Sequence, residues 1–264
     1  MTMMRRGRWL VLAGALLAPQ PILAQVQPHR AEYALRLGVA ANAPRVGRAV
    51  QDINFDCTAW NMDREVATEL ALTPNLKFSL TSRLNGEESR SGNSFRYRTV
   101  QIQNGAERAT HGEVDQLGGE TRVEVVTPDG TERQVLPLQT LMPIAAIGRA
   151  VDHLDAGATS FALLMFAGEA TSAAFRLDVK QIGADALPAV PPALKPVPAP
   201  PGRSWPVQIA VTGLDQQPQK LLLSIRARIF SSGVLERVVV EAGPVTMTAY
   251  LQSLQMHPVQ CPDR

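Results

Sequence analysis

Short runs of alternating apolar and polar residues constrain the fold of this chain more than any other feature of its sequence. From Leu221 to Phe230, apolar residues alternate with serine and arginine, and the same period of two recurs over residues 95–99 and 122–125. This period is typical of a β-strand with one buried and one wetter face. The alternation therefore predicts a sheet that is covered on one side.

Turn dipeptides separate these runs. Glycine after asparagine or aspartate favours a tight hairpin, because both central residues tolerate positive φ. The strong signals are Asn85-Gly86, Asn104-Gly105 and Asp129-Gly130, and the weaker ones are Gly118-Gly119 and Ser232-Gly233. The runs between turns are about 8–14 residues long, which suits antiparallel meanders. We predict a mainly β, antiparallel fold of about 12–14 strands.

One segment has helical spacing instead. Pro143 suits the first turn of a helix, and Gly157 suits its end. Between them, apolar residues recur every three or four positions: Ile144, Ile147, Val151 and Leu154. We predict one amphipathic helix that packs against the sheet.

Residues 1–24 are typical of a secretory signal. Arg5, Arg6 and Arg8 precede an apolar run of about ten residues, which is too short to span a bilayer. Ala24 ends an acceptable cleavage site. We predict that residues 1–24 are cleaved and that the mature chain, 25–264, is exported without a transmembrane segment. An uncleaved anchor helix is the alternative.

The two cysteines, Cys57 and Cys261, lie near the two ends of the mature chain. In an oxidising compartment they most simply form one disulfide. Such a bridge would close a loop of about 200 residues and stabilise the fold by roughly 5 kcal/mol. A redox pair or a reactive thiol is the alternative, although neither cysteine belongs to a Cys-x-x-Cys motif.

Residues 188–206 contain eight of the chain's 20 prolines and predict a stiff segment outside regular helix and strand. It either separates two domains or forms a long loop within one. Because the expected bridge joins the first part of the chain to the last, we favour a single domain over 25–264 with a proline-rich loop at 188–206.

Composition and motifs exclude several functions. Without the three leader arginines, the 26 lysines and arginines fall to 23 against 24 acidic residues, which disfavours nucleic-acid binding. The sequence contains no Gly-x-Ser-x-Gly, His-Glu-x-x-His or P-loop motif. Its four histidines are scattered, and Glu87-Glu88 is expected at a solvated hairpin tip. We expect no catalytic residues, no metal and no cofactor.

Seven ordered segments resemble the EipB (envelope integrity protein B) family of periplasmic proteins. They extend over nearly the whole mature chain and include both cysteines. The segments are His29–Leu35, Gly47-Arg48, Asp56–Trp60, Leu136–Pro143, Phe166–Gly168, Gly233–Leu235 and Pro258–Pro262.

The resemblance implies a periplasmic β-spiral, which is an open, curled, barrel-like sheet with one or two short helices. It also implies a disulfide between Cys57 and Cys261, a role in cell envelope integrity without catalysis, and a periplasmic protein partner, such as a helical-repeat protein.

Two functions follow. The first is a non-catalytic envelope protein that binds another envelope component. The alternative is a carrier that holds a lipid or a lipoprotein acyl chain in a concave sheet, as the similar lipoprotein-carrier folds do. Its lining would include Leu76, Phe78, Leu80, Leu221, Leu223 and Ile225. These residues are also what a packed core contains. A hydrolase lacks support from any motif.

Overall fold

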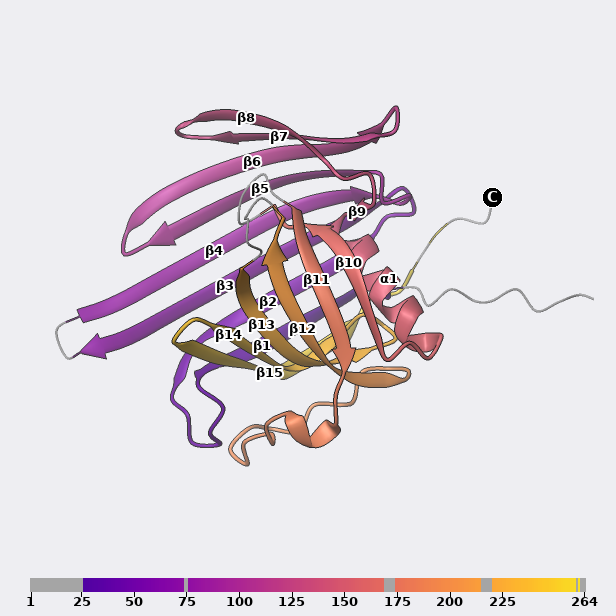
Figure 1. Cartoon of the computed structure of the whole chain (residues 1–264). Helices are drawn as coiled ribbons and strands as arrows, with labels where there is room; N and C mark the ends of the chain where they lie inside the picture. Colours follow the sequence, from indigo (N-terminus) through magenta and orange to yellow (C-terminus); the bar gives the residue numbers. More distant parts are fainter. Residues whose placement is uncertain (1–25, 74–75, 169–173, 215–219, 260, 262–264) are drawn as a thin grey trace, which may run out of the picture.

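The computed structural model describes residues 26–73, 76–168, 174–214, 220–259 and 261. Its strands form one sheet of fifteen strands, in the order β8-β7-β6-β5-β4-β3-β2-β1-β15-β14-β13-β12-β11-β10-β9 (Figure 1). Every pairing is antiparallel except that of β9 with β10. The predicted mainly β fold is confirmed, with slightly more strands than the 12–14 expected. The predicted signal peptide lies outside the described residues.

The sheet has two wings. The N-terminal wing contains β1 (His29–Leu37), β2 (Arg45–Phe55), β3 (Ala59–Thr73), β4 (Leu76–Ser89), β5 (Ser94–Gln103), β6 (Ala106–Leu117), β7 (Glu120–Thr127) and β8 (Gly130–Leu136). The C-terminal wing contains β9 (Thr140–Leu141), β10 (Ser160–Phe166), β11 (Ala174–Gln181), β12 (Ser204–Gly213), β13 (Leu221–Phe230), β14 (Leu235–Ala242) and β15 (Val245–Met256). The helix α1 (Pro143–Asp155) connects β9 to β10, and a 3-10 turn, η1 (Ala184–Ala186), follows β11.

Most of the predicted turns join neighbouring strands. Asn104-Gly105 is the complete loop between β5 and β6, with φ of 51° and 85°. Positive φ at both positions matches the right-handed twist of the flanking strands. Three further dipeptides lie at the β6–β7, β7–β8 and β13–β14 connections: Gly118-Gly119, Asp129-Gly130 and Ser232-Gly233.

The turn predicted at Asn85-Gly86 is wrong, because this dipeptide lies inside β4. Gly86 pairs with Met62 on β3 and with Tyr97 on β5. A Cβ at Gly86 would lie 2.7 Å from Cε2 of Phe95. Glycine is required here by the close approach of an aromatic ring and not by a turn.

The two wings are joined by the first and last strands. Residues 29–37 of β1 pair with residues 247–256 of β15. All other antiparallel pairs among the described strands connect consecutive strands of the chain. The β1–β15 pairing is therefore the long-range contact that turns two meanders into one sheet.

The helix α1 packs between the wings, at one side of the curled sheet (Figure 1). Its start, with Ile144, belongs to a buried cluster of the N-terminal wing that includes Phe95 and Tyr97. Its end, with Val151 and Leu154, packs on a C-terminal-wing cluster made of Val179, Val207 and Ile229. The predicted helix and its apolar face are confirmed. Among the described residues, no helix combines the length and the apolar character needed to cross a bilayer.

Both faces of the strand β10 make packing contacts. Phe161 packs on the cluster around the end of α1. The ring of Phe166 lies 5.8 Å from that of Tyr97 and 6.4 Å from that of Phe95. Phe161 and Phe166 are five residues apart, so they point to opposite faces of the strand. This end of the C-terminal wing therefore lies inside the curl of the N-terminal wing, as a β-spiral requires.

A carboxylate from β4 caps α1. Oε2 of Glu88 accepts a hydrogen bond of 2.7 Å from the amide of Ile144, and Oε1 accepts one of 2.8 Å from the amide of Ala145. These amides have no partner within the helix, and Met142 at the N-cap supplies no side-chain bond. The expectation of a solvated Glu87-Glu88 tip is wrong for Glu88, which is 2% exposed.

The proline-rich segment is packed against the sheet. Pro191 and Pro200 are buried, and Val197 contacts the cluster that contains Tyr33. Nη1 of Arg226 on β13 donates a hydrogen bond of 2.8 Å to the carbonyl of Ala186, at the start of the segment. These contacts hold the segment to β13 and to the cluster around Tyr33.

The end of this segment differs from the prediction. β12 begins at Ser204, so Pro206 lies within a strand and pairs with Arg228 on β13. Its carbonyl accepts a hydrogen bond of 3.0 Å from the amide of Ile182. Proline is tolerated near the start of a strand, where the sheet needs its carbonyl as an acceptor and does not need the N–H that proline lacks.

Replacing Glu88 tests its burial under α1. Burial raises the pKa of Glu88 to about 7, against the lowering effect of the two backbone hydrogen bonds. The folded protein then keeps a proton that the unfolded chain releases, so stability falls as pH rises from about 4.5 to about 7. Relative to Glu88→Gln, the wild type should lose on the order of 3 kcal/mol of unfolding free energy across this window.

Urea denaturation at several pH values measures this difference. Glu87→Gln is the matched control, because Glu87 is exposed on the other face of β4. It should keep the pH dependence of the wild type. A Glu88→Gln variant with wild-type pH dependence would contradict the burial of an ionisable cap.

Candidate functional site

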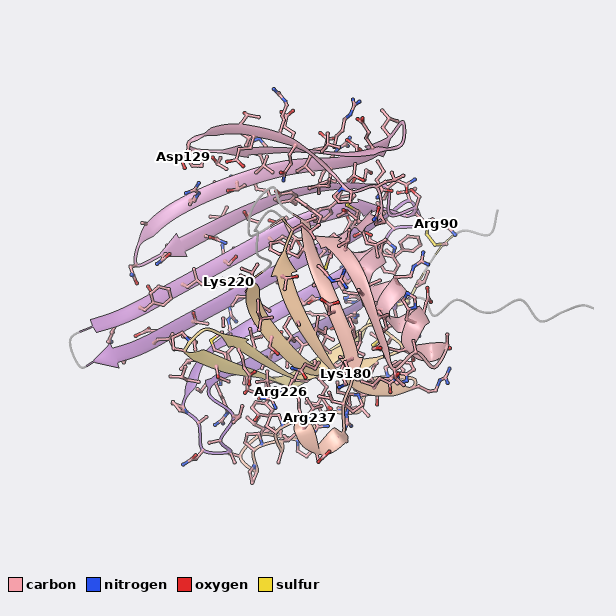
Figure 2. The ribbon with its side chains drawn as sticks, in the orientation of Figure 1. Arg90, Asp129, Lys180, Lys220, Arg226 and Arg237 are labelled. Carbon is pink, nitrogen blue, oxygen red and sulfur yellow. A yellow bond between two sulfur atoms is a disulfide. The ribbon has the colours of Figure 1, made fainter. Side chains whose placement is uncertain are left out.

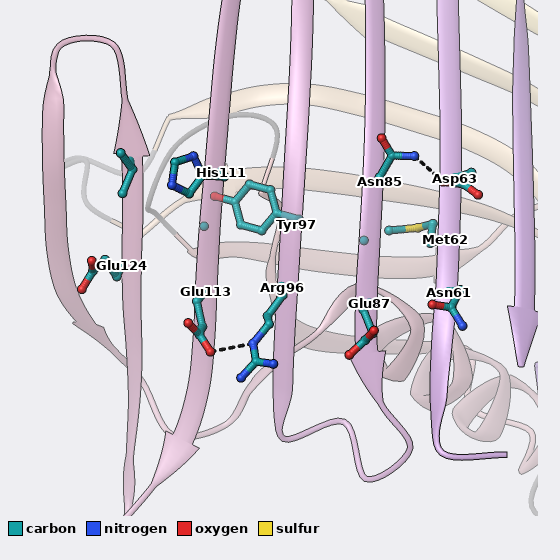
Figure 3. A pocket seen from close by; sticks show the side chains of 13 residues that line it. Asn61, Met62, Asp63, Asn85, Glu87, Arg96, Tyr97, His111, Glu113 and Glu124 are labelled. Carbon is teal, nitrogen blue, oxygen red and sulfur yellow. Dashed lines mark hydrogen bonds and ion pairs between the residues drawn. The ribbon is translucent and has the colours of Figure 1, made fainter. Parts of the chain in front are cut away.

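A groove of about 640 Å³ runs across the outer face of the N-terminal wing, from β3 to β7 (Figure 3). Its floor is one cross-strand row, because Met62 pairs with Gly86, Gly86 with Tyr97, and Tyr97 with Gly112. The side chains of Met62 and Tyr97 belong to the inner core. The outer surface of this row therefore consists of backbone atoms.

Two rows of polar side chains form the walls. One row contains Asn61, Glu87, Arg96, Glu113 and Glu124, and the other contains Asp63, Asn85, His111 and Val126. The first row holds residues of five neighbouring strands, and the second, which includes the apolar Val126, holds residues of four of them; all face the same side (Figure 3). Adjacent strands are about 4.8 Å apart, so the groove is roughly 20 Å long. This length suits an extended chain that lies across the strands.

Ion pairs fix the wall side chains. Nε of Arg96 donates a hydrogen bond of 2.7 Å to Oε1 of Glu113, and Glu113 raises the pKa of Arg96. Nε of Arg133 donates one of 2.6 Å to Oε2 of Glu124 and lowers the pKa of Glu124. Asn85 donates to Asp63 on the other wall. The hydrogen bond from Arg133 therefore favours the ionised form of Glu124.

More carboxylates than guanidinium groups line the groove, although Arg133 pairs with Glu124 and Arg98 lies in the cross-strand row between Asn85 and His111. Four carboxylates line it, from Asp63, Glu87, Glu113 and Glu124, against the one guanidinium of Arg96. Within the described part of the chain, no three histidine, cysteine or carboxylate groups are arranged to hold a metal ion. The arrangement presents hydrogen-bond acceptors and negative charge along a narrow track.

Cys57 and Cys261 form a disulfide, with an S–S distance of 2.11 Å and Cα atoms 5.5 Å apart. Cys57 lies in the turn between β2 and β3, with φ of 74°. Oδ1 of Asp56 accepts hydrogen bonds from the amides of Thr58 and Ala59 and holds this turn. The bridge connects the turn to the residues after β15, outside the groove.

The four histidines lie in three separate places, and only His29 and His257 are near each other. His111 lines the groove, and His153 stacks on Phe161 with ring centroids 4.6 Å apart. His29 is buried, and Nε2 of His257 lies 2.9 Å from Oδ1 of Asp52. Burial lowers the pKa of His29, and the nearby charge of His257 also lowers it.

Four of the six apolar residues expected to line a concave sheet share its inner face. Phe78 and Leu80 lie on the same side of β4 as the buried Leu84, because they alternate with it in steps of two. The same spacing puts Leu223 and Ile225 of β13 on the face of the buried Ile229. Leu221 does not follow this alternation, because the pairing with β12 shifts register between Leu223 and Leu221. Leu221 is 54% exposed, and the other four are partly exposed. The side chain of Leu76 lies outside the described residues.

Sequence reasoning did not find the groove. Its walls alternate with core residues in every strand, so each wall residue looks like an ordinary exposed position. The available signal was glycine inside two strands, at Gly86 and Gly112, since glycine within a strand often marks a close approach of other groups.

The groove floor depends on Gly112. A Cβ at this position would lie 2.5 Å from Oη of Tyr97 and 2.6 Å from its Cζ. Gly112→Ala should destabilise the protein by about 1–3 kcal/mol, because the packed ring cannot yield without strain. In a Tyr97→Leu background the same substitution should cost much less, and a double-mutant cycle by chemical denaturation measures the coupling. Equal costs in both backgrounds would contradict the contact.

Comparison with known proteins agrees with this architecture. The fold matches the crystal structure of a "beta-barrel-like protein of domain of unknown function DUF1849" from Brucella abortus, with a TM-score of 0.73 and 18% sequence identity. The match covers 89% of this chain and 100% of that chain. Among curated proteins, none matches the sequence. Residues 21–258 match the family model described as EipB-like. The resemblance found in the sequence is confirmed, and the chain belongs to the EipB-like family.

Proposed function

We propose that this chain is a non-catalytic periplasmic protein that contributes to cell envelope integrity by binding another envelope component in the groove across β3–β7. The observation that carries the proposal is the groove itself, a track of fixed polar groups on an exposed face (Figure 3). Family membership and the leader-like N-terminus support the compartment.

The charges of the groove suit binding better than proton transfer. A general acid or base works best with a pKa near the operating pH. Here the hydrogen bond from Arg133 lowers the pKa of Glu124, and Glu113 is paired with Arg96. Glu88, whose pKa lies near 7, uses both oxygens to cap α1.

A protein partner with an extended, basic segment fits this surface. Opposite charges across an interface steer association and fix its register. Glu87 is exposed on one wall, between Asn61 and Arg96, and no ion pair among the described residues occupies it, so it is the carboxylate best placed to meet a lysine or an arginine of a partner. A periplasmic helical-repeat protein, which the family resemblance suggests, could present such a segment from a loop.

Complementation tests the proposal in cells that lack the protein. Deletion should sensitise cells to detergents and wall-active drugs, and the wild-type chain should restore resistance. Glu87→Lys should fail to restore it, because the groove then repels a basic segment. Glu107→Lys is the matched control, since Glu107 is exposed on β6 and does not line the groove.

Both variants should accumulate to the wild-type level, because both residues are exposed. Full resistance with Glu87→Lys would contradict binding of the partner in the groove. Unchanged resistance in the deletion strain would contradict the envelope role itself.

Binding of a lipid or lipoprotein acyl chain is the second candidate. The partly exposed apolar residues on the inner face favour it, because Phe78, Leu80, Leu223 and Ile225 belong to none of the buried clusters described above. An acyl chain on this face would remove their remaining apolar surface from water.

Native mass spectrometry of protein purified from the periplasm without detergent tests this candidate. A discrete lipid-sized adduct that is lost in Leu223→Asp would support it. Leu117→Asp is the control, because Leu117 is 70% exposed at the end of β6 and lies outside the inner surface. Wild-type protein that carries no adduct would count against an acyl-chain carrier.

A further inference from the structure

Three arginine side chains and one tyrosine lie together on one face of the strands that join the wings. We refer to them as the arginine cluster. It contains one residue from each of four neighbouring strands, β1, β15, β14 and β13: Arg36, Tyr250, Arg237 and Arg228. Cross-strand pairing puts Arg36, Thr248, Val239 and Arg226 in one row. Tyr250 and Arg228 are two residues further along their strands, so they face the same side.

A β-bulge in β14 places Arg237 next to Tyr250. Because of one extra residue, Arg237 and Val238 both lie opposite Ala227 of β13. Arg237 has φ of 50°, which is a left-handed conformation that is unfavourable for a residue with a side chain. Bulges redirect side chains and are frequent beside binding sites. The bulge therefore gives a reason to look for a ligand at this place.

The hydroxyl group of Tyr250 has no hydrogen-bond partner among the described residues. Tyr250 is nevertheless only 1% exposed. Desolvation raises the pKa of Tyr250, and the nearby charges of Arg36 and Arg237 oppose this shift. A buried hydroxyl without a partner is costly and rare. An acceptor atom bound between the two guanidinium groups would satisfy it.

The cluster carries more positive than negative charge. Its carboxylate, Glu236, lies 3.2 Å from Nε of Arg237 and 3.8 Å from Nε of Arg228. Nη1 of Arg36 donates a hydrogen bond of 2.6 Å to the carbonyl of Ala43, and Nε of Arg36 is buried without a partner. Within the described part of the chain, three guanidinium groups therefore share one carboxylate. Their remaining N–H groups are donors for an anion.

The cluster reaches solvent at one side. The side chains of Arg228 and Glu236 are 27% and 25% exposed. Arg226, the next arginine on this face, is paired with Glu241 and does not belong to the cluster. Figure 2 shows Arg226 and Arg237 close together in the lower part of the C-terminal wing. A ligand can therefore approach from the side of Arg228.

We propose that the arginine cluster binds a phosphate group. Its oxygens accept hydrogen bonds from the hydroxyl of Tyr250 and from the guanidinium groups of Arg36 and Arg237, and Arg228 adds charge on the solvent side. Guanidinium groups suit this ligand, because their N–H groups match phosphate oxygens in pairs. Inorganic phosphate and a phospholipid headgroup share this chemistry. The site lies outside the groove and does not depend on the function proposed for it.

Isothermal titration calorimetry with inorganic phosphate, in a chloride buffer of constant ionic strength, tests the proposal. The wild type should bind one equivalent. Tyr250→Phe and Arg237→Gln should each weaken binding by about tenfold or more, because each removes a hydrogen bond to a charged group. Arg176→Gln is the control and should bind like the wild type, since Arg176 pairs with Asp178 on β11, outside the cluster.

Urea denaturation separates a loss of binding from a loss of folding. Without phosphate, Tyr250→Phe should be at least as stable as the wild type, because it removes a buried hydroxyl that has no partner. With saturating phosphate, the wild type should become the more stable of the two. Wild-type affinity for phosphate in Tyr250→Phe and Arg237→Gln would overturn the site.

Vesicle flotation distinguishes the two sources of phosphate. Vesicles of phosphatidylcholine with phosphatidylglycerol should retain the wild type if the ligand is a headgroup, and free phosphate should compete. Retention that Arg237→Gln loses would support a lipid ligand. Calorimetric binding without retention would support inorganic phosphate. Absence of both would overturn the proposal.

Discussion

The pairing of β1 with β15 holds this molecule together. Each wing is a meander whose strands find their partners through short turns, and the first and last strands join the wings. The surrounding contacts reinforce this junction. The disulfide connects the β2–β3 turn to the residues after β15, and His257 contacts Pro28 and Asp52 at the same end of β1. The neighbouring strands β15, β1 and β2 are thus linked to one another at the start of β1 and the end of β15.

The helix α1 depends on this closure and also completes it. Its two halves pack on different wings, so its position fixes how far the sheet curls. Glu88 then links the start of the helix to β4 through two amides that would otherwise lack partners. The same closure creates a pocket at the start of α1, because Trp60, Ile144 and Val259 come from three distant parts of the chain.

Local patterns in the sequence predicted the strands, most turns and α1, because alternation, positive φ at Asn104-Gly105 and helical spacing after Pro143 are local properties. The two cysteines of an exported chain predicted the disulfide, and the family resemblance supplied the curl. Gly86 was misinterpreted because a turn and a close ring contact both require glycine. Glu88 was misinterpreted because its partners are 56 and 57 residues away. The groove was not predicted from the sequence, because its walls depend on the register of five strands.

Site-specific photo-cross-linking in living cells tests the central functional claim most directly. A photoreactive residue in place of His111 lies in the groove, and one in place of Gln208 lies on the exposed outer face of the C-terminal wing. The account predicts one discrete cross-linked partner from position 111, lost in the Glu87→Lys background, and none from position 208. No cross-link at 111, or the same products at both positions, would contradict binding through the groove.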